Sequence, residues 1–274
     1  MSTNLPPGSR PRDFVLVHGA WHGGWCWELV RERIEAAGHR VHTPTLPGLG
    51  DRADELDAAI GLADHIADVT DYIAARDLRD IVLAGHSYGG MVITGVADAL
   101  KSRIAHILYL DAALPENGQS MISYGTPRPP EAIAATEAGL RSRAPDGIAM
   151  AALPPPLLGI PASHPLHDDV AAQLTPHPLK TWLDTIRLVN GGPAGLPRTY
   201  VHCTAPVMAH TQFPAIARMA KADPDWDYAE LATGHEAMLT APGDVAKLLL
   251  DRLAPLRHPR AQSHRPQATA QEQA

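Results

Sequence analysis

The chain has 274 residues, and its 30 acidic side chains outnumber its 23 lysines and arginines, so its formal net charge is −7. This charge argues against a nucleic-acid partner, because nucleic-acid-binding domains are basic. Hydrophobic residues make up 45% of the chain and charged residues 19%, which suits a folded protein with a sizeable core and excludes a disordered or fibrous one. No apolar run reaches the roughly 18 residues of a membrane span, and the first residues lack the apolar stretch of a signal peptide. We therefore expect a cytoplasmic protein that does not contact a membrane.

Cysteine and histidine spacing gives no sign of a metal site. The two cysteines, Cys26 and Cys203, form neither a metal-binding pair nor a disulfide framework. Among the 15 histidines, His164, His167 and His177 come nearest to a metal-binding group. They lie in a proline-rich segment without the regular helix that a two-histidine motif needs. We expect no metal and no cofactor.

Short apolar runs alternate with amphipathic helical patterns along the chain. Strands are predicted at residues 14–18, 40–45, 81–84, 107–110, 199–203 and 226–231, and helices at 25–37, 62–73, 91–100, 214–222 and 244–253. This alternation predicts one α/β domain, residues 13–257, with a mostly parallel sheet of about six strands and helices on both faces.

Proline is concentrated in one part of the chain. Fourteen of the 26 prolines lie between Pro115 and Pro197, and regular α/β patterns flank this stretch on both sides. We interpret about residues 115–197 as an insertion that forms a cap or lid. Residues 1–12 are expected to be a flexible N-terminus, and the polar residues 258–274 a disordered tail.

The segment GHSYGG at residues 85–90 matches the G-x-S-x-G nucleophile elbow. An apolar strand ends at Gly85, and an apolar helix begins just after Ser87, which is the context that this motif requires. The residues two before and two after the serine must be small, because the strand and helix backbones converge there. The alternative is a serine in a purely structural glycine turn. The motif and its context together predict that Ser87 is a nucleophile.

A serine nucleophile needs N–H donors directed at the oxyanion that forms during the reaction. One is the backbone N–H of the residue after the nucleophile, Tyr88, and the second comes from the loop after the first strand, where the sequence favours Ala20. The alternative is that this loop only ends the strand. Trp21 and His22 stand beside it, and we predict that they contact the substrate.

The general base is expected in a loop late in the chain. His235 lies in the segment ATGHEAML and directly follows the last predicted strand. Active sites of parallel sheets gather at the carboxyl ends of the strands, and His235 is the late histidine at such a position. His86 lies within the elbow, where its side chain should point away from the serine hydroxyl. Other histidines lie on strands or helices away from these loops: His39, His42, His65 and His106.

The acid that orients the base is less evident, because residues 204–210, the loop after the strand at 199–203, contain no carboxylate. Asp111 ends the strand that follows the elbow and therefore stands at the carboxyl edge of the sheet, one strand away from Ser87. We predict that Asp111 is the acid. Its alternative role is to cap a turn or helix, and the alternative acids are Asp225, Asp227 and Glu236.

Four segments resemble the α/β-hydrolase superfamily, and within it the small plant esterase and hydroxynitrile lyase group with its bacterial esterase relatives. They are VLVHGAWHGGWCW at 15–27, TLPGLGDR at 45–52, GHSYGG at 85–90 and GHEAML at 234–239. The resemblance implies a sheet without the first two strands of larger members, a cap over the site, and a Ser-His-acid triad with the Ala20 and Tyr88 N–H groups as oxyanion donors.

Two departures from this group carry information. The usual acid after the sixth strand is missing, and Asp111 instead resembles the acid position of some haloalkane dehalogenases, whose nucleophile is an aspartate where this chain has Ser87. Cyanohydrin-cleaving members have a threonine after the His-Gly pair and a lysine after the catalytic histidine. This chain has Ala20 and Glu236 there, which favours an ester hydrolase over a lyase.

Residues 47–53 also fit a permissive dinucleotide-binding fingerprint. Pro44 and Pro47 disturb the required strand-to-helix turn, and the acid near Asp71 would sit inside a predicted helix, so we reject this interpretation.

The sequence thus predicts a cofactor-free serine hydrolase that acts on a small, largely apolar carboxylic ester through an acyl-enzyme. The alternatives are a non-catalytic small-molecule binding protein on the same fold, or a lyase or thioesterase. The sequence leaves the side-chain directions of the cap open, and with them the substrate, and it indicates no oligomeric state.

Overall fold

A six-stranded parallel sheet forms the centre of the computed structural model, which describes residues 10–252. The sheet order is β2-β1-β3-β4-β7-β8. Its strands are β1 (Asp13–Val17), β2 (Arg40–His42), β3 (Ile81–His86), β4 (Ile104–Leu110), β7 (Arg198–Cys203) and β8 (Asp227–Leu231). The predicted fold class, a mostly parallel α/β sheet of about six strands, is confirmed.

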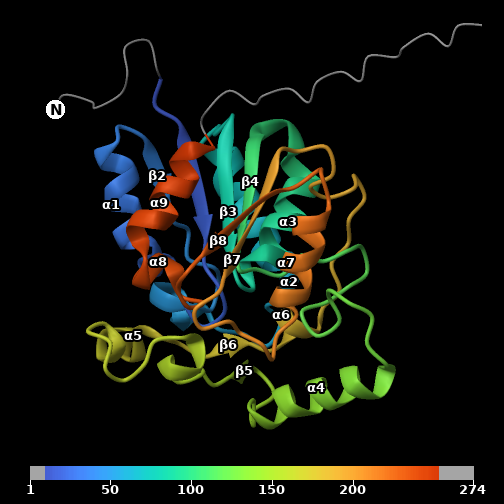
Figure 1. Cartoon of the computed structure of the whole chain (residues 1–274). Helices are drawn as coiled ribbons and strands as arrows, with labels where there is room; N and C mark the ends of the chain where they lie inside the picture. Colours follow the sequence, from blue (N-terminus) through green and yellow to red (C-terminus); the bar gives the residue numbers. More distant parts are fainter. Residues whose placement is uncertain (1–9, 253–274) are drawn as a thin grey trace, which may run out of the picture.

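Helices cover both faces of the sheet (Figure 1). One face packs against α1 (Glu28–Ala36), α8 (Ala237–Thr240) and α9 (Pro242–Asp251), and the other against α2 (Leu62–Ala75), α3 (Gly89–Leu100) and α7 (Phe213–Ala222). Along β1, Phe14 and Leu16 enter one core, whereas Val15 and Val17 enter the other. Since both faces are buried, the central strands are continuous apolar runs rather than alternating ones.

Three elements differ from the sequence-based expectation by three residues or more. The strand predicted at 107–110 begins earlier, at Ile104. The predicted helix at 25–37 begins with a 3-10 turn, Gly24–Trp27, and becomes α-helical only at Glu28. The predicted strand at 40–45 ends at His42. Because β2 lies at the edge of the sheet and Pro44 has no N–H to donate, the ladder stops there.

The proline-rich segment lies at the carboxyl ends of the strands, below the sheet in Figure 1. It contains α4 (Pro130–Ser142), α5 (His167–Gln173), α6 (Lys180–Leu183) and a short antiparallel pair, β5 (Ala149–Met150) and β6 (His177–Pro178). The predicted tail at 258–274, and the predicted flexible N-terminus except residues 10–12, lie outside the described residues.

No helix within residues 10–252 is long and apolar enough to cross a bilayer. The cytoplasmic location expected from the sequence stays a prediction.

Asp98 on α3 fastens the returning end of the proline-rich segment to the core. Its carboxylate accepts the backbone N–H groups of Val189 at 2.9 Å, Asn190 at 2.7 Å and Gly192 at 2.8 Å. Burial by itself would raise the pKa of the Asp98 carboxyl group. The three N–H donors outweigh that effect by stabilising the charged form, so the pKa lies below its usual value.

Replacing this carboxylate should therefore destabilise the protein. We expect Asp98→Asn to lower the free energy of unfolding at pH 7 by about 1.5–3 kcal/mol, because an amide offers one acceptor oxygen in place of two. The folded-state pKa is depressed, so the contribution of the carboxylate is present above the unfolded-state pKa and is lost as the pH falls through the folded-state pKa. The difference between wild type and variant in urea denaturation should thus shrink below about pH 4.

Asp54→Asn, at an exposed aspartate, is the control and should leave the unfolding curve unchanged at both pH values. Equal stability of the Asp98→Asn and wild-type proteins at pH 7 would contradict this role of Asp98.

Candidate active site

Ser87 occupies the turn between β3 and α3 with φ +54°, a left-handed conformation that is unusual for a residue other than glycine. The strand and helix approach each other closely at this turn. A Cβ added to Gly85 would lie 2.7 Å from the carbonyl oxygen of Gly89, and one added to Gly90 would lie 2.0 Å from that of Ala113. The Ser87 carbonyl accepts the N–H groups of Gly90 at 3.1 Å and Ala113 at 2.9 Å. Small residues are therefore required on both sides of the serine.

His235 and Asp111 form a buried hydrogen-bonded pair. The Nδ1–H of His235 donates to Oδ2 of Asp111 at 2.7 Å, and the two residues are 2% and 1% exposed. Asp111 directly follows β4 with φ +42°, and its other carboxylate oxygen accepts the Cys203 N–H at 3.4 Å. This pairing leaves Nε2 of His235 as the nitrogen available to a reacting group.

Two of the alternative acids do not contact His235. Asp225 and Asp227 are exposed at the amino end of β8, where they pair with Arg198 and Arg252. Within the described residues, the carboxylate hydrogen-bonded to the His235 ring is that of Asp111.

A cavity of about 260 Å³ opens above this pair, and Ser87 and His235 both line it. Most of its remaining wall is apolar or aromatic: Trp21, Met121, Tyr124, Leu153, Leu158, Trp182, Met208 and Phe213. Trp21, which the sequence predicts to contact the substrate, is among them. The elbow, the buried histidine and the proline-rich segment thus meet at one hollow.

Hydrogen bonds to the proline-rich segment hold the loop that follows β1. Trp21 adopts φ +65°, and its N–H donates to Nδ1 of His177 at 3.3 Å. Its carbonyl accepts the Thr175 N–H at 2.9 Å. No hydrogen bond formed within residues 10–252 uses the backbone N–H of Ala20 or Tyr88, the two predicted oxyanion donors. Neither residue is among those that line the cavity, so their role as oxyanion donors stays a prediction.

His22, the other predicted substrate contact, does not line the cavity. Its Nδ1–H donates to the Ala20 carbonyl at 2.7 Å. The other ring nitrogen, Nε2, lies 3.3 Å from a carboxylate oxygen of Glu236, without hydrogen-bond geometry, and both side chains are 1% exposed. Glu236 therefore faces His22.

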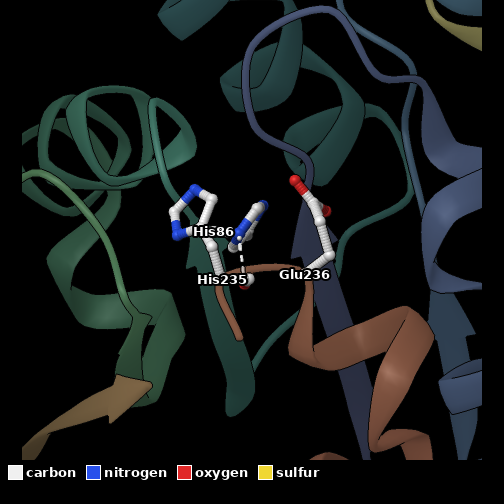
Figure 2. A group of neighbouring side chains, drawn as sticks. All are labelled: His86, His235 and Glu236. Atoms are coloured by element: carbon white, nitrogen blue, oxygen red, sulfur yellow. Dashed lines mark hydrogen bonds between the residues drawn. The ribbon is translucent and has the colours of Figure 1, made fainter. Parts of the chain in front are cut away.

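Figure 2 shows His86, His235 and Glu236 side by side. Each offers a potential ligand atom, and these atoms lie within 4.8 Å of one another, the one such group of three in the described part of the chain. His86 Nε2–H donates to the backbone carbonyl of His235 at 3.1 Å, drawn dashed in Figure 2, and Asp111 takes up Nδ1 of His235. These bonds fix His86 against the loop that carries His235. The structure does not bring His164, His167 and His177 into such a group.

Electrostatics distinguish His235 from the other buried histidines. Burial lowers the pKa of His18 to about 3 and that of His65 to about 4, and it holds those of His86 and His177 well below the usual value. Burial also opposes protonation of His235, but the hydrogen bond and charge of Asp111, with the charge of Glu236, outweigh it and raise the pKa. Of these five buried histidines, His235 is the one whose protonated form its surroundings stabilise.

Several cavity residues were not predicted from the sequence. Phe213 stacks on the His235 ring, with centroids 5.2 Å apart and planes inclined by 12°. It stands at the start of α7, in the segment after β7, and its position at that carboxyl end was the signal that could have revealed it. Tyr124, Arg128 and Arg143 also line the cavity, but they come from the proline-rich segment, whose pattern indicates no side-chain direction.

A profile of the alpha/beta hydrolase family matches residues 14–248, nearly the whole described chain. With the parallel sheet, the strand-turn-helix around Ser87 and the buried His235–Asp111 pair, this match identifies the class of protein. The chain belongs to the alpha/beta hydrolase family.

Similar proteins of known activity and structure show where in this family the chain belongs. The carbendazim hydrolyzing esterase of Nocardioides sp. (strain SG-4G) is 38% identical over 242 residues, which cover 86% of this chain and 98% of that protein. Methylesterase 7 of Arabidopsis thaliana is 35% identical over 110 residues, 39% of this chain and 42% of that protein. Among solved structures, an extracellular α/β-hydrolase from a Paenibacillus species matches with TM-score 0.74 and 26% identity, covering 88% of this chain and 99% of that one. The chain is a carboxylesterase-like enzyme, and its predicted resemblance to the plant esterase group and its bacterial relatives is confirmed.

The close approach at the elbow predicts a strong effect of one methyl group. Gly90→Ala should lower the free energy of unfolding by about 2 kcal/mol or more, because the new Cβ would collide with the Ala113 backbone. Gly139→Ala, in α4 with nothing within 4 Å of the added atom, should be neutral or stabilising by up to about 1 kcal/mol. Guanidinium denaturation measures both, and equal stability of the two variants would show that the elbow tolerates a larger residue.

Proposed function

We propose that this enzyme hydrolyses a small, largely apolar carboxylic ester through an acyl-enzyme on Ser87. His235 acts as the base, Asp111 orients the imidazole, and the backbone N–H groups of Ala20 and Tyr88 bind the oxyanion. The observation that carries this proposal is the 2.7 Å hydrogen bond between buried His235 and Asp111 at a cavity that Ser87 also lines.

In the first half of the reaction, the Ser87 hydroxyl oxygen attacks the ester carbonyl carbon while Nε2 of His235 takes the hydroxyl proton. The tetrahedral oxyanion accepts the two backbone N–H groups, each typically worth about 3–4 kcal/mol. The acyl C–O bond then breaks, and the imidazolium gives its proton to the leaving alcohol.

In the second half, a water molecule attacks the acyl-enzyme, again with His235 as base, and the acid product leaves. Asp111 keeps the Nδ1 proton in place throughout and stabilises the imidazolium formed in each half.

Three further observations support ester hydrolysis. The relatives are named esterases and methylesterases, a description that fits small ester substrates. The cavity of about 260 Å³ has room for a small molecule, and its wall is mostly apolar or aromatic. Ala20 and Glu236 replace the threonine and lysine of cyanohydrin-cleaving members, which weighs against a lyase.

Ser87→Ala should abolish turnover of short-chain p-nitrophenyl esters and leave the fold intact, since the hydroxyl makes no contact that the fold needs. A fluorophosphonate probe should label the wild-type protein on the peptide that carries Ser87, as located by mass spectrometry, and should not label the variant. Retained turnover in a folded Ser87→Ala protein would exclude the mechanism. A folded wild-type protein that neither reacts with the probe nor hydrolyses esters would favour a binding protein instead.

Asp111→Asn should lower kcat by about 10³–10⁴-fold, because the amide no longer holds the imidazole in the required tautomer. His235 must be neutral to act as base, so activity rises as the pH increases through its pKa. Removing Asp111 removes the main causes that raise this pKa and leaves the opposing effect of burial, so the midpoint of the pH profile should move to lower pH. Asp227→Asn, at an exposed alternative acid, should change neither kcat nor the profile. Unchanged turnover in Asp111→Asn would assign the acid elsewhere.

A further inference from the structure

The cavity contains a positive charge that ester hydrolysis alone does not explain. Arg128 and Arg143 line it together with Ser87 and His235, and no aspartate or glutamate of the described residues does. Neither arginine takes part in an ion pair within residues 10–252. Guanidinium groups are charged at every physiological pH, so the hollow holds two cations without an anion.

Not every N–H group of Arg128 has an acceptor among the described residues. It lies just before α4 and is half-buried. Its Nη2 donates to the Ile122 carbonyl, and its Nη1 lies at a long 3.4 Å from the Thr136 hydroxyl. Its Nε is buried and has no partner among the described residues. A buried donor on a charged group without an acceptor is unfavourable, and an anion beside the guanidinium reduces that penalty through its charge.

Arg143, at the other end of α4, is placed differently. Its guanidinium lies over the Trp21 ring, 5.4 Å from the centroid, and its Nη2 donates to the Ala151 carbonyl. One face of the group is thus covered by an aromatic ring. Both arginines add to the positive potential of the cavity, and Arg128 is the one whose Nε lacks an acceptor among the described residues.

The geometry of an arginine side chain indicates which anion fits. The planar fork of a guanidinium matches the two oxygens of a carboxylate, and such charge-assisted bonds are stronger than neutral ones. Most of the remaining cavity wall is apolar or aromatic, so it suits a short methylene chain.

We propose that the cavity selects esters that carry a second, ionised carboxyl group, namely monoesters of short dicarboxylic acids, and that Arg128 binds the free carboxylate. This inference rests on the proposed function and replaces its largely apolar ester by one that has a charged end: the ester carbonyl lies at Ser87, and the carboxylate lies at Arg128. Water cleaves the acyl C–O bond, the alcohol leaves with its proton, and a dicarboxylic acid is released.

The test compares two esters of equal shape. Monomethyl glutarate carries the carboxylate, and methyl 5-methylhexanoate has an isopropyl group in its place. At pH 7.5 the wild-type enzyme should favour the glutarate ester by at least about tenfold in kcat/KM, the range expected of a hydrogen-bonded charge. This preference should decrease as salt is added.

Variants assign the preference to one residue. Arg128→Gln should bring the kcat/KM ratio of the two esters close to one, and Arg128→Lys should restore part of it. Arg187→Gln removes an exposed arginine of the same segment that does not line the cavity, and it should leave the ratio unchanged. A preference that survives Arg128→Gln would overturn the assignment to Arg128, and a wild-type ratio near one would overturn the inference itself.

Binding to the Ser87→Ala protein separates this inference from the proposed function. Calorimetric titration should show monomethyl glutarate binding at least about tenfold more tightly than methyl 5-methylhexanoate. If the wild-type enzyme hydrolyses neither ester but this binding difference is present and depends on Arg128, the proposed function fails and the carboxylate site stands. If both esters are hydrolysed and bound equally, the esterase stands and the carboxylate site fails.

Discussion

Three neighbouring strands are followed by residues whose backbones turn into the left-handed region, and the geometry of the site depends on these turns. Trp21 lies in the loop after β1 with φ +65°, Ser87 follows β3 with φ +54°, and Asp111 follows β4 with φ +42°. Each such conformation costs about 1–3 kcal/mol in a residue other than glycine, so the surrounding structure must stabilise it. The sheet order places these strands next to one another, and all three turns therefore occur along one edge. Packing elsewhere in the fold thus maintains backbone strain where the chemistry is proposed.

Several buried histidines lie near this edge of the sheet, and burial keeps four of them neutral. His18, His65, His86 and His177 are all held in the uncharged form and serve as hydrogen-bonding parts of the framework. His235 differs because a carboxylate is bonded directly to its ring. Among these five imidazoles, the surroundings favour the protonated form of His235 alone.

The fold and most of the proposed triad could be predicted from the sequence, because the patterns that indicate them are local. The glycines around Ser87, the apolar run before it and the position of His235 after the last strand each lie within a few residues of the feature that they predict. Asp111 required a topological argument: no carboxylate follows β7, and parallel strands present their carboxyl ends together. The orientation of His22 depends on a bond to the Ala20 carbonyl that no periodicity reveals. The directions of Arg128 and Arg143 are set by how a proline-rich segment packs, so the charge of the cavity was likewise beyond the sequence.

The contacts of Trp21 with Thr175 and His177 have an evolutionary consequence. They tie both backbone groups of Trp21, the residue after Ala20, to a short stretch of the proline-rich segment. The rest of that segment, α4 included, forms walls of the cavity and meets Trp21 only at its ring, as Arg143 and Trp182 do, so its side chains can diverge and change which acids or alcohols enter. His177 lacks that freedom, because its side chain accepts the N–H of Trp21, the residue after Ala20. Selectivity and chemistry can therefore evolve separately within one continuous insertion.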